Sequence, residues 1–409
     1  MRPYLPHKSS HNIVKLTFWG LATLSALSGC SYLPSQLASP AQQISPGQQV
    51  SEEPIKALSP LSTTNKITPR LLWQKQLDSK QLGHVEIFPK IVGNAILVAD
   101  RYNVSSWNKK TGQLLWKEPL TEKISGGVST TKSTVFVGTE NGSAIALDSK
   151  TGKTQWITLL QQPIVSISSE KDGKVIFRTL NGKIHALSSK NGDLLWQRTQ
   201  QTPALSLEGA STPIIAGPFV ITGFDNGSVV AYELESGKEA WSAKLGFESS
   251  LTELSRLIDI DAEMVAIGTA LFAVSYQGVI AGIDMRKGKV GWKRKISSFT
   301  GIDANEKELF VSDNQGHIWK LNPLTGDPVW KNDDLLRRAP TAPTIVGNSL
   351  VVVGDSEGYL HWYNRQTGKI VGRVRGDSNG YTVAPTVQGN TIYTLGEGGL
   401  LSAYSISGK

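Results

Sequence analysis

The sequence predicts an all-β protein, an eight-bladed β-propeller of four-stranded antiparallel blades, in residues 70–409. Three observations predict it: a unit that repeats about every 40 residues, a Trp at a fixed place in the unit, and no sustained 3.6-residue hydrophobic period. Repetition at such a period is the signature of folds in which each unit is one supersecondary structure. The chain has 409 residues, 39% of them hydrophobic, which is enough for one such domain.

The first 29 residues are predicted to be a signal peptide. A basic stretch that ends at Lys15 precedes an apolar run, 16–27, and the small residues Ser28 and Gly29 follow it. A positively charged start, a short apolar segment and small residues are the three parts of a secretory signal. The apolar run is also shorter than the roughly 20 residues that a membrane-spanning helix needs.

Cys30 is the only cysteine of the chain, and it follows Leu-Ser-Gly. This segment resembles the lipobox of bacterial lipoproteins, which implies cleavage before Cys30 and acylation of its side chain. Several acyl chains on one cysteine would hold the protein stably on a membrane. Ser31 stands where an Asp would signal retention in the inner membrane, so the resemblance implies the periplasmic face of the outer membrane.

Residues 30–69 are predicted to be the lipidated cysteine and a disordered tether. The segment is rich in Pro, Ser and Gln and has few aromatic residues, so it cannot bury a core of its own. Loss of the signal peptide, with Arg2, Lys8 and Lys15, lowers the formal net charge from +8 to +5. The remaining basic residues do not cluster with aromatic ones, and the sequence therefore does not indicate nucleic-acid binding.

The repeating unit has a β-rich run, a Gly, an alternating run, a second Gly ten residues later and a Trp four residues beyond that. Five sets share this spacing: Gly142, Gly152 and Trp156; Gly182, Gly192 and Trp196; Gly227, Gly237 and Trp241; Gly278, Gly288 and Trp292; Gly316, Gly326 and Trp330. Asn-Gly at 141–142, 181–182 and 226–227 favours hairpin turns, because both central turn positions need φ > 0. A large Trp at one phase is predicted to pack between blades, with ligand stacking as the alternative.

The Trp positions predict the number of blades. Trp116, Trp156, Trp196, Trp241, Trp292, Trp330 and the degenerate Gly372 mark seven. The last unit has Gly398 and Gly408, and the chain ends before the Trp of that unit. The run 70–77, which contains Trp73, matches the missing strand. An N-terminal strand that joins the last blade gives the eighth blade and leaves no unpaired edge between the chain ends.

Two links between blades are predicted to be longer than the others. The intervals between successive Trp residues from Trp116 to Trp330 are 40, 40, 45, 51 and 38 residues. Because the Gly-to-Trp distance inside a unit is constant, the extra residues are assigned to the links 198–217 and 245–270. Enlarged loops on a rigid scaffold are common binding sites. Leu205 and Leu207 in one link, and acidic residues in the other, suit an apolar contact beside charged groups.

The chemistry of the chain favours binding over catalysis. Repeats such as 146–156, Ala-x-Asp-x-x-Thr-Gly-x-x-x-Trp, resemble those of quinoprotein alcohol dehydrogenases, so a quinone-dependent dehydrogenase is the enzymatic alternative. That family uses a disulfide between adjacent cysteines and carboxylates around calcium, whereas this chain has Cys30 alone. No HExxH or P-loop motif is present. We expect neither an enzyme nor a cofactor.

Two groups of titratable residues could suggest a metal site. The histidines His84, His185, His317 and His361 are expected to be packed or at the surface, since His185 and His361 fall in opposite blades. Asp259, Asp261 and Glu263 alternate, but the segment lacks the Gly and the distal Glu of an EF-hand. These carboxylates suit a basic partner or a solvated face better than a metal ion.

Three segments, 203–213, 256–261 and 354–362, resemble the BamB family, lipoproteins of the β-barrel assembly machinery. The resemblance covers the chain from the lipobox to the last strand, with a longer tether than is usual. It implies a monomeric, non-enzymatic periplasmic scaffold of the Bam complex, which binds the POTRA domains of BamA and assists insertion of outer-membrane proteins. Nascent outer-membrane proteins are a further partner class. A generic peptide-binding propeller is the remaining alternative.

The resemblance also implies a binding site. Where the family has Leu-Ser-Leu-Arg-Gly, this chain has Leu205, Leu207 and Gly209 in the matching places and Glu208 instead of Arg. A reversed charge at an interface should be answered by a change in the partner. With the second link, the predicted partner-binding residues are Leu205, Leu207, Glu208, Arg256, Asp259 and Asp261.

Overall fold

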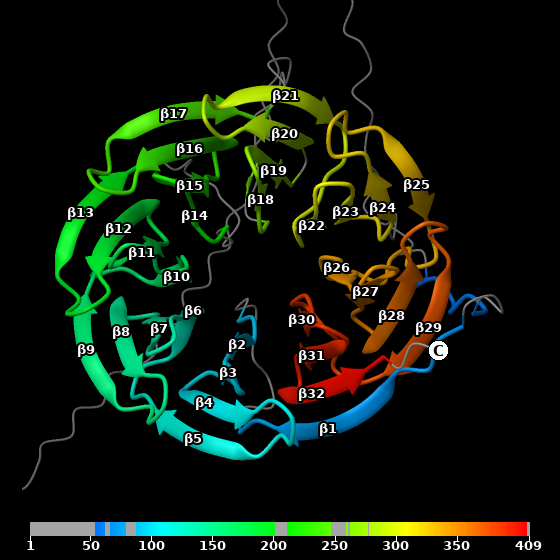
Figure 1. Ribbon diagram of the computed structural model, residues 1–409, viewed down its shortest axis with the longest axis horizontal. Coiled ribbons are helices and arrows are strands. Elements are labelled where there is room, and N and C mark those ends of the chain that lie inside the picture. The colour runs from blue at the N-terminus through cyan, green and yellow to red at the C-terminus, as the bar shows by residue number, and fades with distance from the viewer. Residues whose placement is uncertain are drawn as a thin grey trace, which may run out of the picture. The chain divides into compact units, whose positions relative to one another are not determined.

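The computed structural model describes residues 54–61, 66–78, 87–200, 211–246, 259–260, 262–276 and 278–406. They form a ring of eight four-stranded antiparallel sheets (Figure 1). The prediction of an eight-bladed β-propeller is therefore confirmed. Every regular element in the described ranges is a strand. These ranges contain no helix of the length and hydrophobicity that a membrane span requires.

The first four blades follow one another along the chain, each with its four strands in sequence order. Blade 1 contains β2 (Lys90–Val92), β3 (Ala95–Ala99), β4 (Asn103–Asn108) and β5 (Leu114–Pro119). Blade 2 contains β6 (Ile124–Thr130), β7 (Thr134–Thr139), β8 (Ser143–Asp148) and β9 (Thr154–Leu159). Blade 3 contains β10 (Ile164–Ile167), β11 (Lys174–Thr179), β12 (Lys183–Ser188) and β13 (Leu194–Thr199). Blade 4 contains β14 (Ile214–Ala216), β15 (Phe219–Gly223), β16 (Ser228–Glu233) and β17 (Glu239–Lys244).

The other four blades repeat this order until the last one, which borrows a strand from the start of the domain. Blade 5 contains β18 (Val265–Ile267), β19 (Ala270–Val274), β20 (Ile280–Asp284) and β21 (Lys289–Arg294). Blade 6 contains β22 (Ile302–Ala304), β23 (Leu309–Ser312), β24 (Ile318–Leu321) and β25 (Pro328–Asn332). Blade 7 contains β26 (Thr344–Val346), β27 (Leu350–Gly354), β28 (Tyr359–Asn364) and β29 (Ile370–Arg375). Blade 8 contains β30 (Thr386–Gln388), β31 (Thr391–Leu395), β32 (Leu400–Ser405) and β1 (Arg70–Gln76).

The core lies between neighbouring blades. The middle strands are covered on both sides, and all six residues of β7 are buried. The outer strand β9 of the same blade has one buried residue, Trp156. Between blades 1 and 2, for example, Leu97 and Val104 pack with Val135 and Val137. The propeller thus buries its apolar residues in wedges between sheets, which explains why the middle strands read as continuous β-branched and aromatic runs.

Strand β1 closes the ring. It pairs antiparallel with β32 from Arg70, opposite Ser405, to Gln76, opposite Leu400. Trp73 is 8% exposed, and its Nε1 donates a hydrogen bond to the carbonyl oxygen of Lys109 in blade 1 at 3.0 Å. The first strand therefore completes the last blade, as predicted, and contacts the first blade.

Seven tryptophans of the outer strands form a ring of contacts, in which the indole of one blade packs on a glycine of the next. The pairs are Trp73 with Gly112, Trp116 with Gly152, Trp156 with Gly192, Trp196 with Gly237, Trp241 with Gly288, Trp292 with Gly326 and Trp330 with Gly368. A Cβ atom on any of these glycines would lie 2.3 to 2.7 Å from the nearest ring atom. Within one Gly-x-x-x-Trp motif, the Gly therefore contacts the preceding blade and the Trp contacts the following blade.

The ring has two faces, which follow from the antiparallel order of the strands. The link face carries the turn between the second and third strands of each blade and the link to the next blade. For example, Leu160 in the link after blade 2 donates its N–H to the carbonyl oxygen of Gly142 in such a turn. The hairpin face carries the turns between first and second and between third and fourth strands, such as that at Gly152.

The tether was predicted to extend to residue 69. Its residues 54–61 and 66–69 are in contact with the propeller. They lie against blades 6 and 7 in Figure 1. Ile67 donates its N–H to the carbonyl oxygen of Val371 at 2.9 Å, and its side chain covers Gly372, where the Trp of the repeat is missing. Apolar and hydrogen-bonding residues inside a Pro-rich segment explain this docking.

Candidate functional site

The two lengthened links leave and re-enter the ring at the link face, between blades 3 and 4 and between blades 4 and 5. Strand β13 ends at Thr199 and β14 begins at Ile214, and β17 ends at Lys244 and β18 begins at Val265. Their place in the ring agrees with the Trp spacing. The links 333–343 and 376–385 are also long, but they lie beyond Trp330, where the counted Trp intervals end.

Most of the predicted binding residues lie outside the described residues: Leu205, Leu207, Glu208, Arg256 and Asp261, and also Cys30. Asp259 is described and is 3% exposed. Its carbonyl oxygen accepts a hydrogen bond from the N–H of Tyr276 at 2.8 Å, which pairs the end of the link with blade 5. Asp259 is therefore a buried residue of the second link, and its role in partner binding stays a prediction.

The end of the first long link is fixed by the blades on both sides of it. Ser166 of blade 3 donates its Oγ hydrogen to the carbonyl oxygen of Ser211 at 3.2 Å. The Oγ of Ser211 accepts a hydrogen bond from the N–H of Gly223 in blade 4 at 3.1 Å. A Cβ atom on Gly223 would come within 2.4 Å of Ile260, at the end of the second link. The glycine thus permits close contact between blade 4 and the second link.

A buried ion pair supports the same region. Arg178, at the link-face end of β11, lies 2.9 Å from the carboxylate of Asp225 in the turn of blade 4. The two side chains are 2% and 5% exposed. Arg178 also donates to the carbonyl oxygen of Gly223 at 2.8 Å, and its guanidinium lies over the ring of Phe224. The sequence signal for this pair is a charged residue at the end of the apolar run of β11.

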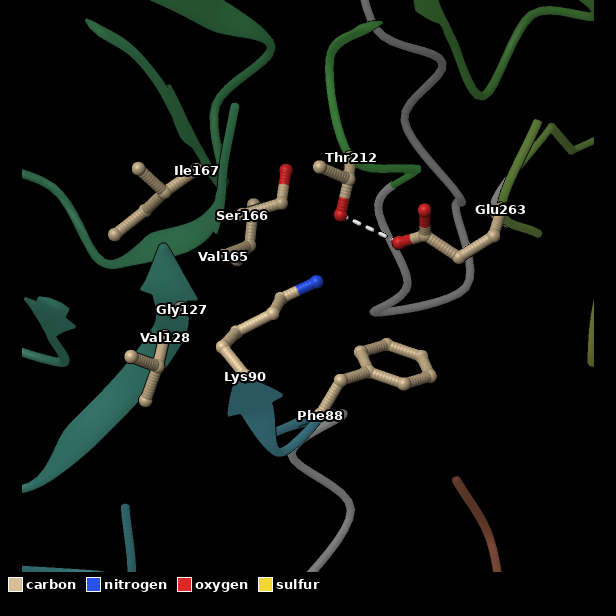
Figure 2. A pocket seen from close by; sticks show the side chains of 9 residues that line it. All are labelled: Phe88, Lys90, Gly127, Val128, Val165, Ser166, Ile167, Thr212 and Glu263. Carbon is tan, nitrogen blue, oxygen red and sulfur yellow. Dashed lines mark hydrogen bonds between the residues drawn. The ribbon is translucent and has the colours of Figure 1, made fainter. Parts of the chain in front are cut away.

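The two links meet at the centre of the ring, where Thr212 donates a hydrogen bond to Glu263 at 2.5 Å (Figure 2). These residues border a small pocket that is open to solvent. It is lined by Phe88, Lys90, Gly127, Val128, Val165, Ser166, Ile167, Thr212 and Glu263. The side chain of Lys90 points into the space between Phe88 and Thr212 (Figure 2), and its ammonium lies 5.6 Å from the centre of the Phe88 ring.

The polar groups around this cavity hold blades together. The hydroxyls of Ser166 and Thr212 are both engaged across a blade boundary, with Ser211 and Glu263 respectively. The sequence did not indicate the Thr212–Glu263 contact, because the two residues lie in different links. The arrangement forms a rigid central seam between the two links, which suits a surface that must hold its shape when a partner binds.

Of the four histidines that follow the predicted signal peptide, three lie in the described residues. His361 contacts Asp355, His317 contacts Asp313, and His185 contacts Thr179. Blades 3 and 7, which hold His185 and His361, are on opposite sides of the ring (Figure 1). In the part of the chain that the structure describes, no group of three or more His, Cys, Asp or Glu side chains could hold a metal ion.

The burial of His185 predicts loss of stability in mild acid. Burial, assisted by Lys183, lowers the pKa of His185 to about 4, against about 6.5 in the unfolded chain. Above pH 6.5 the imidazole is neutral in both states. As the pH falls from 6.5 toward 4, His185 binds a proton in the unfolded chain but not in the folded chain. The free energy of unfolding therefore decreases by up to about 3 kcal/mol.

Urea unfolding at pH 7.5, 6.0 and 4.5 measures this dependence. The variant His185→Gln should lose less stability between pH 6.5 and 4 than the unmodified protein. Equal losses in the two proteins would contradict the assignment of the effect to His185, because carboxylates that titrate in this range are common to both.

The family comparison matches most of the propeller. The model described as "Outer membrane protein assembly factor BamB" matches residues 100–332 and 320–408. The protein of that name from Escherichia coli strain K12 is 34% identical over 371 residues, which cover 87% of this chain and 90% of the relative. The corresponding protein of Yersinia pestis is 32% identical over 368 residues, 86% of this chain and 89% of the relative.

Solved structures agree with this relationship. The crystal structure of BamB from Moraxella catarrhalis matches with a TM-score of 0.75 and 27% identity, and covers 82% of this chain and 99% of that one. Quinohemoprotein alcohol dehydrogenase from Comamonas testosteroni matches with a TM-score of 0.66, 83% and 77% coverage, and 15% identity, which shows the shared fold alone. The chain belongs to the BamB family of outer membrane protein assembly factors.

Proposed function

We propose that this protein is a non-enzymatic scaffold of the outer-membrane β-barrel assembly machinery that binds the POTRA domains of BamA. Acylated Cys30 would attach it to the periplasmic face of the outer membrane. The observation that carries the proposal is the pair of long links, joined through Thr212 and Glu263, in a chain with 34% identity to an outer membrane protein assembly factor.

The binding surface is proposed to be the two long links. Leu205 and Leu207 would supply apolar contacts, and Glu208, Arg256 and Asp261 would supply charges at the border. Asp259 is buried and would act by holding the end of the second link. Because both links return to the ring through fixed ends, the surface would bind with a small loss of conformational entropy.

Replacement of both Leu205 and Leu207 by Ala is expected to weaken binding to the cognate BamA by at least tenfold. Each leucine contributes about 1.5–3 kcal/mol when it is fully buried, and tenfold corresponds to about 1.4 kcal/mol. The measurement is the affinity of the purified protein for the periplasmic region of BamA.

A matched control replaces Leu194 and Leu195 by Ala. These leucines are 49% and 47% exposed on the outer strand of blade 3, and the change should leave the affinity unchanged. Both variants should keep the melting temperature of the unmodified protein. Unchanged affinity of the Leu205→Ala/Leu207→Ala protein would contradict the proposed surface. Independently of that result, a photo-crosslinking residue at position 208 would identify in cells the protein that contacts this link.

A further inference from the structure

Residues 54–61 and 66–69, here called the strap, are held on blades 6 and 7 by hydrogen bonds to their main chain. Arg338 donates to the carbonyl oxygen of Lys56 at 3.1 Å, and Arg373 donates to that of Ser59 at 3.0 Å. The N–H of Lys56 in turn donates to the carbonyl oxygen of Leu336 at 3.2 Å. Each contact fixes the path of the strap backbone.

The two arginines are themselves held in place by the propeller. Arg338 donates to Asp355 at 2.6 Å, and these side chains are 5% and 0% exposed. His361 lies 2.9 Å from the same carboxylate and accepts a hydrogen bond from Arg373 at 3.1 Å. The strap carbonyls therefore bind to donors that are already oriented, which lowers the entropic cost of docking.

Side chains of the strap add specific contacts. Lys56 forms an ion pair with Asp333, and Ser59 donates to Asp334 at 2.5 Å. Leu61 packs on the cluster that contains Phe310 and Tyr363. With Ile67 on Gly372, two apolar residues of the strap enter the propeller surface. The neighbouring Ile55 and Leu58 are 47% and 37% exposed.

The strap crosses the rim from one face of the ring to the other. Its C-terminal end continues into β1 at Arg70, which pairs with Ser405 at the hairpin-face end of β32. Its N-terminal end is Pro54, whose carbonyl oxygen accepts a hydrogen bond at 2.9 Å from Arg337 in the link between blades 6 and 7. Arg337 donates its own N–H to the carbonyl oxygen of Gln315 in the link-face turn of blade 6.

We propose that the strap determines the face from which the membrane anchor leaves the propeller. Without it, the chain from Cys30 would enter the domain at Arg70, on the hairpin face. With it, that chain enters at Pro54, on the link face. The significance of this arrangement rests on the proposed function, since the link face carries the two long links. The strap would then keep the binding surface on the side of the disc where the anchor attaches.

Distances from Cys30 to each face test the proposal without a membrane. The mature chain is produced in the cytoplasm without its signal peptide, so that Cys30, the only cysteine, stays unacylated and takes a nitroxide label. A second label is placed on blade 6 at Gln315→Cys, on the link face, or at Leu324→Cys, on the hairpin face, where Leu324 is 82% exposed. Double electron–electron resonance should give a shorter mean distance from Cys30 to position 315 than to position 324.

The variant Leu61→Asp/Ile67→Asp should release the strap and reverse the order of the two distances. Deletion of residues 54–69, which joins residue 53 directly to Arg70, should reverse it as well. The control Ile55→Asp/Leu58→Asp adds the same charges at exposed strap positions and should preserve the order. The proposal would be overturned if Cys30 were equally far from positions 315 and 324 in the protein with the unmodified strap. It would also be overturned if position 315 stayed the nearer of the two after the deletion.

The proposed membrane attachment and the proposed partner are tested by separate measurements. Flotation of the acylated protein with phosphatidylethanolamine–phosphatidylglycerol vesicles reports on the anchor, and affinity for BamA reports on the partner. Because the labelled protein is unacylated and alone, its distances do not depend on either result. A protein that does not float with vesicles, or does not bind BamA, would therefore leave the conclusion about the exit face unchanged. Label distances that contradict the exit face would likewise leave the results on membrane attachment and BamA binding unchanged.

Discussion

Removal of residues 70–77 is expected to convert the closed monomer into an unfolded or self-associating chain. The deletion takes away β1, the partner of β32 along six residue pairs, and with it Trp73 and Leu77 from the core between blades 8 and 1. Net stabilities of domains are only about 5–15 kcal/mol, so the loss of an entire strand is large. The exposed edge of β32 would also be available to pair with another chain.

Size-exclusion chromatography with light scattering and thermal melting measure this effect. The point variant Trp73→Ala should lose about 3–5 kcal/mol by loss of the buried indole. The control Leu71→Ala/Leu72→Ala alters leucines of the same strand that are 44% and 43% exposed, and it should change stability far less. A monomeric deletion protein with an unchanged melting temperature would contradict closure by β1.

Replacement of Arg178 by Leu is expected to cost about 3–5 kcal/mol of unfolding free energy. The substitution leaves the carboxylate of Asp225 buried without its guanidinium partner, and an uncompensated buried charge is strongly destabilising. It also removes the donor to the carbonyl oxygen of Gly223. The change should appear as a lower midpoint of urea unfolding, followed by tryptophan fluorescence.

Two further variants isolate the role of the buried charge. The double substitution Arg178→Leu/Asp225→Leu should recover most of the lost stability, because no unpaired charge remains. Arg286→Leu breaks the pair with Asp284, in which the arginine side chain is 66% exposed, and should cost less than about 1 kcal/mol. A single Arg178→Leu protein as stable as the Arg286→Leu protein would disprove the assigned role.

The Arg178 pair also connects stability to the proposed binding surface. Gly223 and Ser211 lie between this pair and the ends of the long links. A change at Arg178 should therefore disturb the position of the first link as well as the stability of the ring. The link ends are held by the blades, and a partner that contacts the links would sense any shift of blades 3 and 4.

Repetition made the fold predictable from the sequence. Each unit carries its own turn signals, such as Asn141-Gly142, and its own Trp at a constant distance from them. The same local sequence signals therefore occur many times along the chain. The missing Trp after Gly408 and the extra one at Trp73 indicated ring closure for the same reason. The lengthened links were visible because the constant spacing made any insertion measurable.

The candidate site was only partly predictable. The links that contain Leu205 and Asp259 were located by spacing, but the burial of Asp259 depends on its pairing with Tyr276, a contact between distant segments. The Thr212–Glu263 bond joins two links across the centre of the ring. Nothing in either link indicates which residue of the other will be adjacent.

The sequence by itself determined the class of fold, the number of blades and the place of the long links, because these properties are local and repeated. Only the tertiary structure showed that each motif Gly receives the Trp of the preceding blade. It alone placed the strap across the rim and paired Arg178 with Asp225. Such contacts join residues from different blades, and their partners are selected by the curvature and closure of the ring, which no single repeat specifies.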